Sequence, residues 1–350
     1  MLWQKFCRNR QALAGLIFIA LLSLCAILGY VITPDGTPFS NSQQLSIAAR
    51  PPMFSVQMLR VKKENEAAQK NIFTKMLYGQ EANYTEIPTS KIRYEGEKVY
   101  VVEYCEPCTN VESERIFDKR ETLGAGQKTF LLGTDRFGRD LLSRLIIGAR
   151  VSLAVGLIAV LISLLVGVSL GALAGYFGGK IDAVVSWFTN VTWSIPTLLM
   201  VIAITMALGK GFWQVFVAVG LTMWVDVARM VRGQVLSVKQ KEFVEAAKAL
   251  GYSHARIIFR HILPNIISPI IVITASNFAS AILVEAGLNF LGIGAQPPMP
   301  SWGSMIKDHY AYIMLSAAHL AIAPGVLIVL TVLAFTFVGN GLRGAADSRE

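Results

Sequence analysis

Six long apolar runs constrain what this sequence of 350 residues can fold into. Each run has about 20 mostly apolar residues, the length that a helix needs to cross a bilayer. Hydrophobic residues make up 53% of the chain and charged residues only 16%, which is more apolar than one soluble core requires. We therefore expect an all-α integral membrane protein with six transmembrane helices, beginning near Leu13, Val151, Ala183, Phe212, Ile266 and Ala317.

Basic residues predict how these spans are oriented. Lys5, Arg8 and Arg10 precede the first run, which reaches Ile32 without a convincing small-x-small cleavage site, so a retained anchor is favoured over a signal peptide. Because short basic loops stay in the cytoplasm, we expect the N-terminus and the basic stretch 229–261 on that side. Six spans return the C-terminus to the same side, so both termini are expected in the cytoplasm.

The segment Pro34–Phe130 differs from the rest of the chain. It holds 13 basic and 13 acidic residues, so the net charge of +9 lies entirely outside it. That basic surplus follows the positive-inside bias and does not imply a nucleic-acid partner. We expect three parts: residues 1–33 with the first span, an exported insert at 34–130, and a core at 131–350.

The insert is predicted to be a small mixed α/β domain. Residues Met58–Leu77 predict a helix that Gly79 closes, because glycine readily adopts the conformation that ends a helix. The sequence IRYEGEKVYVVEY (92–104) predicts two strands around a Glu-Gly turn, with Val99 and Val101 on one face.

Cys105 and Cys108 form a CxxC pair in this insert. An oxidising exterior favours a local disulfide between them, with a metal site and unpaired thiols as the alternatives. Zinc would need two further ligands, and the insert contains no histidine, so we expect no metal.

Three polar side chains inside the predicted spans are candidates for a pathway or gate. Asn190 lies in the third span, and Asn277 and Glu285 lie in the fifth. In lipid such groups must face the protein interior or a water-filled path. The alternative is hydrogen-bonding glue between helices. Glu285 is taken as the one acidic residue clearly inside a span, with Arg139 or Arg144 as its expected companion.

Two enzyme-like motifs are incomplete. GVSLG (167–171) matches the G-x-S-x-G nucleophile pattern, but Ser169 is predicted in mid-helix rather than on the strained strand-to-helix turn that this chemistry needs. A P-loop at 174–181 would need Gly first and Ser or Thr last, where the sequence has Ala174 and Ile181. We expect no catalysis, no ATP site and no cofactor in this chain.

Residues 242–264 predict a helix, a sharp turn and a second helix, here called the knob. Glu242–Leu250 contains strong helix formers. Phe243, Ala246, Ala247 and Leu250 recur at helical spacing and are expected on one exposed side. The knob either docks into a groove of a soluble partner or lies on the membrane surface, and physical reasoning alone leaves both open.

The turn of the knob is specified by individual residues. Gly251 stands where a helix end requires a left-handed conformation, and Ser253 can cap the second helix. Pro264 is expected to prevent that second helix from continuing unbroken.

The knob resembles the EAA loop of ABC importer permeases. Glu245-Ala246-Ala247, Gly251 and Leu263-Pro264 match that motif within residues 239–265, whereas His261 stands where the family usually has isoleucine. In that family the loop is the coupling helix that seats in a groove of the cytoplasmic ATPase, so the resemblance implies ATPase docking for these six matching residues.

Three further stretches resemble C-type permease subunits of dipeptide and oligopeptide importers: residues 131–153, 290–306 and 339–349. Asn340 and Gly344 depart from the family, where Asp is common, and the insert is longer than usual. The resemblance implies the type I importer permease fold with an extra insert. It also implies an external segment leading into the second span, with the matching residues Gly133, Asp135, Gly138, Arg139 and Asp140. Local pairing that only folds this loop is the alternative role for Asp135, Arg139 and Asp140.

The resemblance also implies a set of partners in the bacterial inner membrane. These are a second, B-type permease subunit, two cytoplasmic ATP-binding subunits, an extracytoplasmic solute-binding protein and membrane lipid. The expected cargo is a peptide or a related small solute. An ion-coupled secondary transporter and a membrane sensor are the rival functions; the first would need more intramembrane acids or histidines, and the second needs fewer helices.

Overall fold

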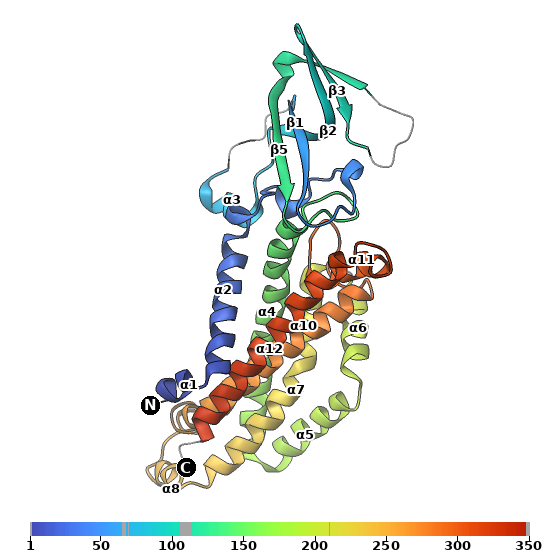
Figure 1. Cartoon of the computed structure of the whole chain (residues 1–350). Coiled ribbons are helices and arrows are strands. Elements are labelled where there is room, and N and C mark those ends of the chain that lie inside the picture. Colours follow the sequence, from blue (N-terminus) through green and yellow to red (C-terminus); the bar gives the residue numbers. More distant parts are fainter. Residues whose placement is uncertain (1, 65–67, 69, 106–113, 210, 348–350) are drawn as a thin grey trace. The chain divides into compact units, whose positions relative to one another are not determined.

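The computed structural model describes residues 2–64, 68, 70–105, 114–209 and 211–347 (Figure 1). The chain divides into two compact units. The first comprises Met1–Leu22, Ser152–Gln296 and Val326–Glu350, and the second comprises Ser23–Val151 and Pro297–Gly325. Three helices contribute residues to both units: α2 (Arg10–Ile32), α4 (Leu141–Phe177) and α12 (His319–Asp347).

The other elements each belong to one unit. The first unit adds α1 (Leu2–Arg8), α5 (Gly179–Trp193), α6 (Thr197–Leu208), α7 (Phe212–Lys239), α8 (Glu242–Ala249), α9 (His254–Ile257), the π-helical turn η4 (Ile258–Ile262), the 3-10 turn η5 (Leu263–Ile266) and α10 (Ile267–Phe290). The second adds η1 (Pro38–Ser40), η2 (Leu45–Ile47), β1 (Phe54–Lys62), α3 (Ile72–Tyr78), β2 (Tyr84–Glu95), β3 (Lys98–Glu103), β4 (Glu114–Asp118), η3 (Lys119–Glu121), β5 (Thr122–Phe130), α11 (Trp302–His309) and η6 (Tyr310–Ile313).

Five helical segments in the described part of the chain are long and apolar enough to cross a membrane: Arg10–Ile32, Leu141–Phe177, Trp213–Lys239, His254–Phe290 and His319–Ala345. The expected third span is broken, because α5 and α6 meet at 94°. Pro196 stands at this break; it lacks an amide hydrogen and disfavours helical geometry in the preceding residue. The fold is therefore mostly helical with five or six apolar helices, and six are reached only if α5 and α6 together count as one span.

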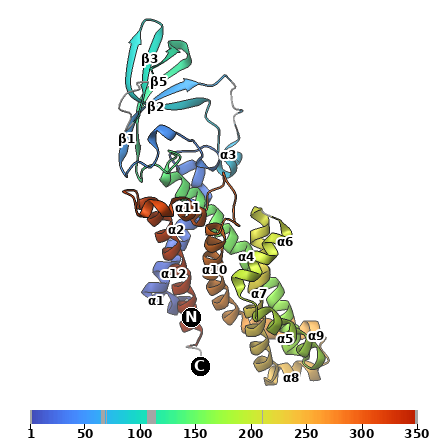
Figure 2. The same ribbon diagram turned by 90° about the vertical axis from the view of Figure 1, so that its right-hand side faces the viewer.

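Close contact between α4 and α7 organises the first unit. A Cβ atom at Gly171 would lie 2.5 Å from the carbonyl oxygen of Ala228, and one at Gly175 would lie 2.8 Å from that of Arg232. Gly167 meets α7 in the same way, one turn earlier. Figures 1 and 2 both draw α4 beside α7. Small residues at this spacing let two helix backbones approach, which is the packing that membrane helices favour.

The G-x-S-x-G pattern belongs to this packing face. Ser169 lies within α4, and its hydroxyl donates to the carbonyl oxygen of Leu165 at 2.7 Å. A serine held inside a continuous helix has no strained turn to present its oxygen. The predicted mid-helix position of Ser169 is confirmed.

One apolar cluster joins the knob to α7. Val235 and Val238 of α7 are buried with Val244 and Ala247 of α8 and with Ile257 of α9. Since full burial of one Val or Ile side chain is worth about 1.5–3 kcal/mol, this cluster holds α8 firmly against the end of α7.

The insert contains a five-stranded antiparallel sheet in the order β4-β3-β2-β1-β5. The expected hairpin is present as β2 and β3, with Val99 and Val101 buried. The expected helix Met58–Leu77 is wrong in its first part, because Met58 lies in β1 and faces a buried cluster. Among the described residues of this stretch only α3 is helical, and Gly79 follows it with φ of 72° as expected. The insert is therefore a mixed α/β domain.

Replacing Gly171 with leucine should destabilise the first unit, because the new side chain has no room between α4 and α7. Overpacking of this kind costs about 1–3 kcal/mol. Gly233→Ala in α7 is the matched control, since nothing lies within 4 Å of a Cβ atom placed there. Thermal unfolding of the detergent-solubilised chain measures both variants, and equal melting temperatures would contradict the packing role of Gly171.

Candidate functional site

The knob forms the helix, turn and helix that its sequence predicts. Gly251 has φ of 73°, and no atom lies within 4 Å of a Cβ placed there, so glycine is required for its backbone conformation rather than for space. Ser253 caps α9, and its hydroxyl accepts from the backbone N–H of Arg256 at 3.4 Å. Acidic Glu242 and Glu245 occupy the first turn of α8, where they favourably oppose the helix dipole.

The exposed side of α8 differs from the expected stripe at one position. Phe243, Ala246 and Leu250 are exposed, and Leu250 keeps 71% of its accessible surface. Ala247 is only 3% exposed and packs beside Val244, so its expected place on the exposed side is wrong. Ala247 follows Val244 by three residues, so the two lie on the same side of the helix, and this side packs against α7. The exposed Phe243, Ala246 and Leu250 form a line along one side of α8, with the methyl group of Ala246 at its middle.

The second helix of the knob continues further than Pro264 led us to expect. The chain passes from α9 through the π-helical turn η4 and the 3-10 turn η5 into α10. The side-chain amide of Asn265 donates to the carbonyl oxygen of His261 at 2.6 Å. Leu263 packs partly against the knob cluster, and Pro264 is exposed. The change of helix type accommodates Pro264 without a break.

Two aromatic contacts stabilise the knob, one with α4 and one within the knob itself. The hydroxyl of Tyr176, at the end of α4, lies 2.9 Å from Nδ1 of His254 at the start of α9. The ring of His261 stacks on Tyr252, with ring centroids 5.7 Å apart. The knob is therefore tied to α4 as well as to α7.

The external segment is organised around the buried carboxylate of Asp135. This side chain is 1% exposed and accepts hydrogen bonds from the backbone N–H groups of Phe137 and Arg139, at 2.8 and 3.0 Å. Arg139 also donates from its guanidinium at 2.7 Å, and the Nε of Arg144 lies 3.6 Å away. Two arginines thus share one carboxylate, which supports the local-pairing role for Asp135 and Arg139.

The glycines and the second acid of this segment have separate structural roles. Gly133 and Gly138 both have positive φ, and a Cβ on either would collide with the carbonyl oxygens of Arg50 and Gln44 respectively. Asp140 caps α4 by accepting from the backbone N–H of Ser143 at 2.8 Å. Burial raises the pKa of the Asp140 carboxyl above its ordinary value, and the bonds from Ser143 oppose that rise.

His309 is a buried partner of this segment that sequence reasoning missed. Its Nδ1 lies 2.7 Å from the carbonyl oxygen of Met305, and its Nε2 accepts from the backbone N–H of Arg136 at 3.4 Å. Burial lowers the pKa of His309, so the neutral ring that can accept this bond is favoured. Arg136 also pairs with Asp308 at 3.1 Å. The separation of over 170 residues left no local signal for this contact.

Asn190 lines a cavity of about 410 Å³ between α5 and α7. Its side-chain oxygen accepts from Arg229 at 3.0 Å, and the Arg229 guanidinium lies 4.1 Å from the ring centroid of Trp193. Arg232 donates from two nitrogens to the two carboxylate oxygens of Asp182, at 2.5 and 2.6 Å. Charged pairs within membrane spans are costly and typically mark functional regions.

The expectation that Glu285 is the one acid inside a span is wrong. Asp182 lies in the bent pair of α5 and α6, and Asp226 lies within the span Trp213–Lys239. Asp182 was missed because it directly precedes Ala183, where the third span was expected to begin, and Asp226 because the run from Phe212 is otherwise mostly apolar. The charge of Asp182 is visible in the sequence, but its partner Arg232 lies 50 residues away.

Glu285 is 1% exposed and is bonded within the first unit. The hydroxyl of Ser152 donates to its carboxylate at 3.2 Å, and the side-chain amide of Asn289 donates to it as well. Asn289 in turn accepts from the backbone N–H of Ala295 at 2.6 Å. Glu285 thereby helps to anchor the loop after α10. Asn277 is also buried, and its side-chain nitrogen has no hydrogen-bond partner among the described residues.

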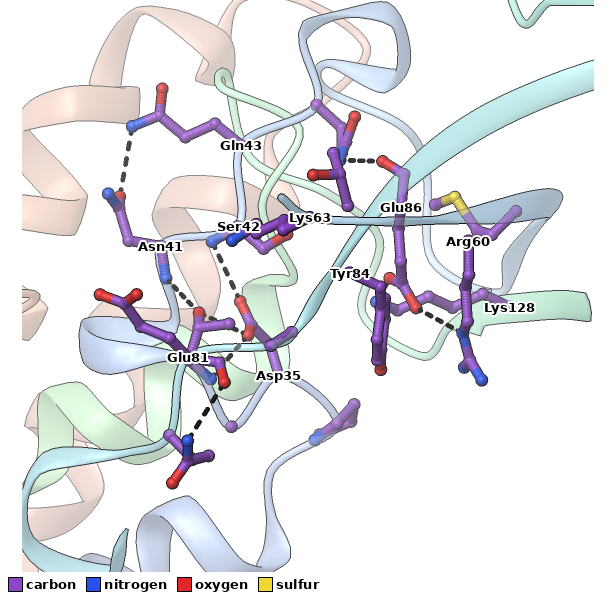
Figure 3. Close-up of a pocket in the computed structure, with 18 of the residues that line it drawn as sticks. Asp35, Asn41, Ser42, Gln43, Arg60, Lys63, Glu81, Tyr84, Glu86 and Lys128 are labelled. Carbon is purple, nitrogen blue, oxygen red and sulfur yellow. Dashed lines mark hydrogen bonds and ion pairs between the residues drawn. The ribbon is translucent and has the colours of Figure 1, made fainter. Parts of the chain in front are cut away.

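The second unit contains a further hollow of about 990 Å³ between residues 34–44 and one face of the sheet (Figure 3). The carboxylate of Glu86 pairs there with Arg60 at 3.3 Å and Lys128 at 2.5 Å. The carboxylate of Asp35 accepts from the backbone N–H groups of Thr37 and Ser42 at 3.0 and 3.2 Å. These acids hold the walls of the hollow together.

The predicted disulfide cannot be placed as a pair, because Cys108 lies outside the described residues. Cys7 and Cys25 are free, as their positions in the membrane part suggest. The pairing of Cys105 with Cys108 stays a prediction.

Two protein-family profiles match this sequence. Residues 167–350 match the profile described as "Binding-protein-dependent transport system inner membrane component". Residues 1–52 match the "N-terminal TM domain of oligopeptide transport permease C". Between them they cover both ends of the chain and leave most of the insert unmatched.

Several curated proteins are similar over most of their length. A dipeptide transport system permease protein of Alkalihalophilus pseudofirmus is 44% identical over 217 residues, 62% of this chain and 71% of the relative. A glutathione transport system permease protein of Pectobacterium atrosepticum is 40% identical over 238 residues, 68% and 79% of the two chains. An oligopeptide transport system permease protein of Haemophilus influenzae is 42% identical over 218 residues, 62% and 70% of the two.

Two solved structures are more distant. A chain of the inward-facing MetNI methionine ABC transporter is 20% identical, with a TM-score of 0.49 over 59% of this chain and 97% of its own length. A chain of an amino acid ABC transporter solved with histidines is also 20% identical, with a TM-score of 0.42 over 60% and 95% of the two chains.

Replacing Asp135 with asparagine should strongly destabilise the second unit, because it removes the carboxylate that pairs directly with the buried Arg139 and Arg144. Removing one partner of a buried pair costs about 3–5 kcal/mol. Asp308→Asn is the matched control, since its pair with Arg136 is partly exposed and worth only about 0–1 kcal/mol. Chemical unfolding followed by circular dichroism compares the two; similar losses would contradict the central role of Asp135.

Proposed function

Since this chain belongs to the family of inner membrane permeases of binding-protein-dependent transport systems, we propose how its own residues couple an importer's transport cycle to ATP hydrolysis. It is a non-catalytic membrane subunit of an ABC importer. In this proposal, two cytoplasmic ATP-binding subunits hydrolyse ATP, a B-type permease completes the path, and an extracytoplasmic solute-binding protein delivers the cargo. We further propose that α5 and α6 together form one of six spans, with both termini and the knob in the cytoplasm.

The exposed line on α8 is the observation that carries the docking proposal. Ala246 lies between the larger side chains of Phe243 and Leu250, so a groove on a partner can approach the helix closely at its middle. Glu245 is exposed beside this line. The partner in this proposal is the ATP-binding subunit, and the contact is a helix seated in a groove.

The packing beneath α8 gives this contact a mechanical consequence. Val244 and Ala247 are buried against α7. A partner that displaces α8 therefore also displaces α7. The contact of Tyr176 with His254 couples the same displacement to α4. We propose that ATP-driven closure of the partner moves the knob with these helices and switches the path between inward and outward access.

Polar groups of α5 and α7 are proposed to line this chain's half of the path. Asn190, Arg229 and Arg232 border the 410 Å³ cavity. A guanidinium group binds carboxylate and carbonyl oxygens readily, and peptides carry both. The relatives named above transport dipeptides, oligopeptides and glutathione, so peptides are the cargo that we propose. Asn277 and Glu285 are proposed to act at the gate, with Glu285 as a loop anchor.

Ala246→Arg should abolish co-purification of the ATP-binding subunit, because a long charged side chain fills the centre of the docking line. Gly251→Val should do the same by straining the turn, at a cost of about 1–2 kcal/mol for a left-handed residue. Gly251→Asn should retain docking, since asparagine tolerates that conformation and the site is open.

Lys248→Ala is the surface control for this experiment, because Lys248 is exposed on a different side of α8. Membrane insertion is measured in parallel, so that loss of docking is separated from loss of the protein. If the Ala246→Arg chain co-purified as much ATP-binding subunit as the unaltered chain, docking through α8 would be refuted.

Cargo identity is tested by ATP hydrolysis in proteoliposomes that contain the whole assembly. Dipeptides, tripeptides, glutathione and longer peptides are each presented with the solute-binding protein, and we expect peptides to stimulate hydrolysis. Stimulation by a non-peptide solute alone would overturn the peptide assignment while leaving the permease function in place.

A further inference from the structure

Helix α3 of the insert exposes an unusual amount of apolar surface. Five of its seven residues are apolar, and Ile72, Phe73, Leu77 and Tyr78 each keep between 54% and 77% of their accessible surface. A cluster of this kind on so short an element is not the single exposed apolar residue that soluble surfaces tolerate. Some apolar medium or partner is therefore expected to cover it.

One arginine fixes α3 at a defined level along α2. The guanidinium of Arg150 donates to the carbonyl oxygens of Met76 and Leu77 in α3, both at 2.9 Å. The same group donates to the carbonyl oxygens of Ala26 and Ile27 in α2, both at 3.0 Å. Because these two residues lie five to six positions before the end of α2 at Ile32, the C-terminal end of α3 lies about 8 Å along the helix axis from that end.

Further contacts keep α3 in this place. The backbone N–H of Gln80 donates to the carbonyl oxygen of Gly36 at 2.9 Å. A Cβ at Gly79 would lie 2.9 Å from the same oxygen and 3.0 Å from the ring of Tyr30, so the turn after α3 packs tightly against the end of α2. The position of α3 is therefore set by the second unit itself.

The surface of α2 at this level is also apolar and exposed. Leu24, Ile27 and Val31 are each more than half exposed on a helix of the length and hydropathy that crosses a membrane. Where α2 crosses the bilayer, these side chains face its apolar interior, and an element held beside Ala26 and Ile27 shares that environment.

We propose that α3 is an interfacial membrane helix, whose apolar side chains lie among the lipid acyl chains on the side of the bilayer that carries the insert. The residues in and next to α3 are typical of such a helix. Tyr78 is of a type that is enriched at the level of the lipid headgroups, and Lys70 and Lys75 supply positive charge for lipid phosphates. The insert is then anchored to the membrane at α3 as well as by α2 and α4. This inference depends on α2 crossing the membrane and not on the identity of the cargo.

Spin-label accessibility tests the proposal in the assembled complex in phospholipid vesicles. Phe73→Cys is made in a chain that carries Cys7→Ser and Cys25→Ser, and a nitroxide is attached. Oxygen, which concentrates in lipid, should relax this label more effectively than a water-soluble nickel chelate. Ile116→Cys in β4 is the matched control, because Ile116 is 55% exposed in the sheet, and its label should favour the nickel chelate. The parent chain without either new cysteine supplies the background.

Two results would overturn the proposal. Preferential relaxation of the Phe73 label by the nickel chelate would place α3 in water. Protection of the label from both reagents would place it against another protein subunit. Labels at Ile72 and Leu77 repeat the measurement, so that a single variant that fails to assemble does not decide the outcome.

Discussion

The contact between the backbones of α4 and α7 is the constraint on which the rest of the first unit depends. Three glycines at every fourth position allow it, and any side chain there would strike the carbonyl oxygens or side chains of α7. The position of α7 then sets the place of Arg229 and Arg232, and its end carries the knob. One helix pair therefore links the polar cavity with the surface that we propose for ATPase docking.

Burial of charge has two different outcomes in this chain. Around Asp135 the carboxylate is saturated by two arginines and two backbone N–H groups, so the cost of burial is offset within the loop itself. Around Asn190 the arginines border open space as well as their partners. The first arrangement is suited to holding a loop rigid, whereas the second leaves donors near a volume that a solute can enter.

Much of the fold follows from local sequence pattern, and the exceptions have identifiable causes. The apolar runs, the turn at Gly251, the cap at Ser253 and the hairpin of β2 and β3 are each encoded by neighbouring residues. Met58 was assigned to a helix because Met58 and Leu59 are adjacent apolar residues, each buried in a different cluster, and this pair interrupts the alternation of β1. The burial of Ala247 could not be predicted, since α8 has apolar residues on two sides and only the position of α7 decides between them. The pair of Asp182 with Arg232 and the contact of His309 with Arg136 join distant residues, which one sequence cannot reveal.

The π-helical turn η4 has a consequence for the direction in which the knob points. A π-helical turn contains one residue more than the α-helical turn that it replaces. The five residues Ile258–Ile262 therefore cover about the same rotation as four residues of an α-helix, so the extra residue does not rotate α9 and α8 by the roughly 100° that one residue adds to an α-helix. The direction in which the alanine-centred surface faces thus depends on the helix type of this one turn, independently of which side chains that surface carries.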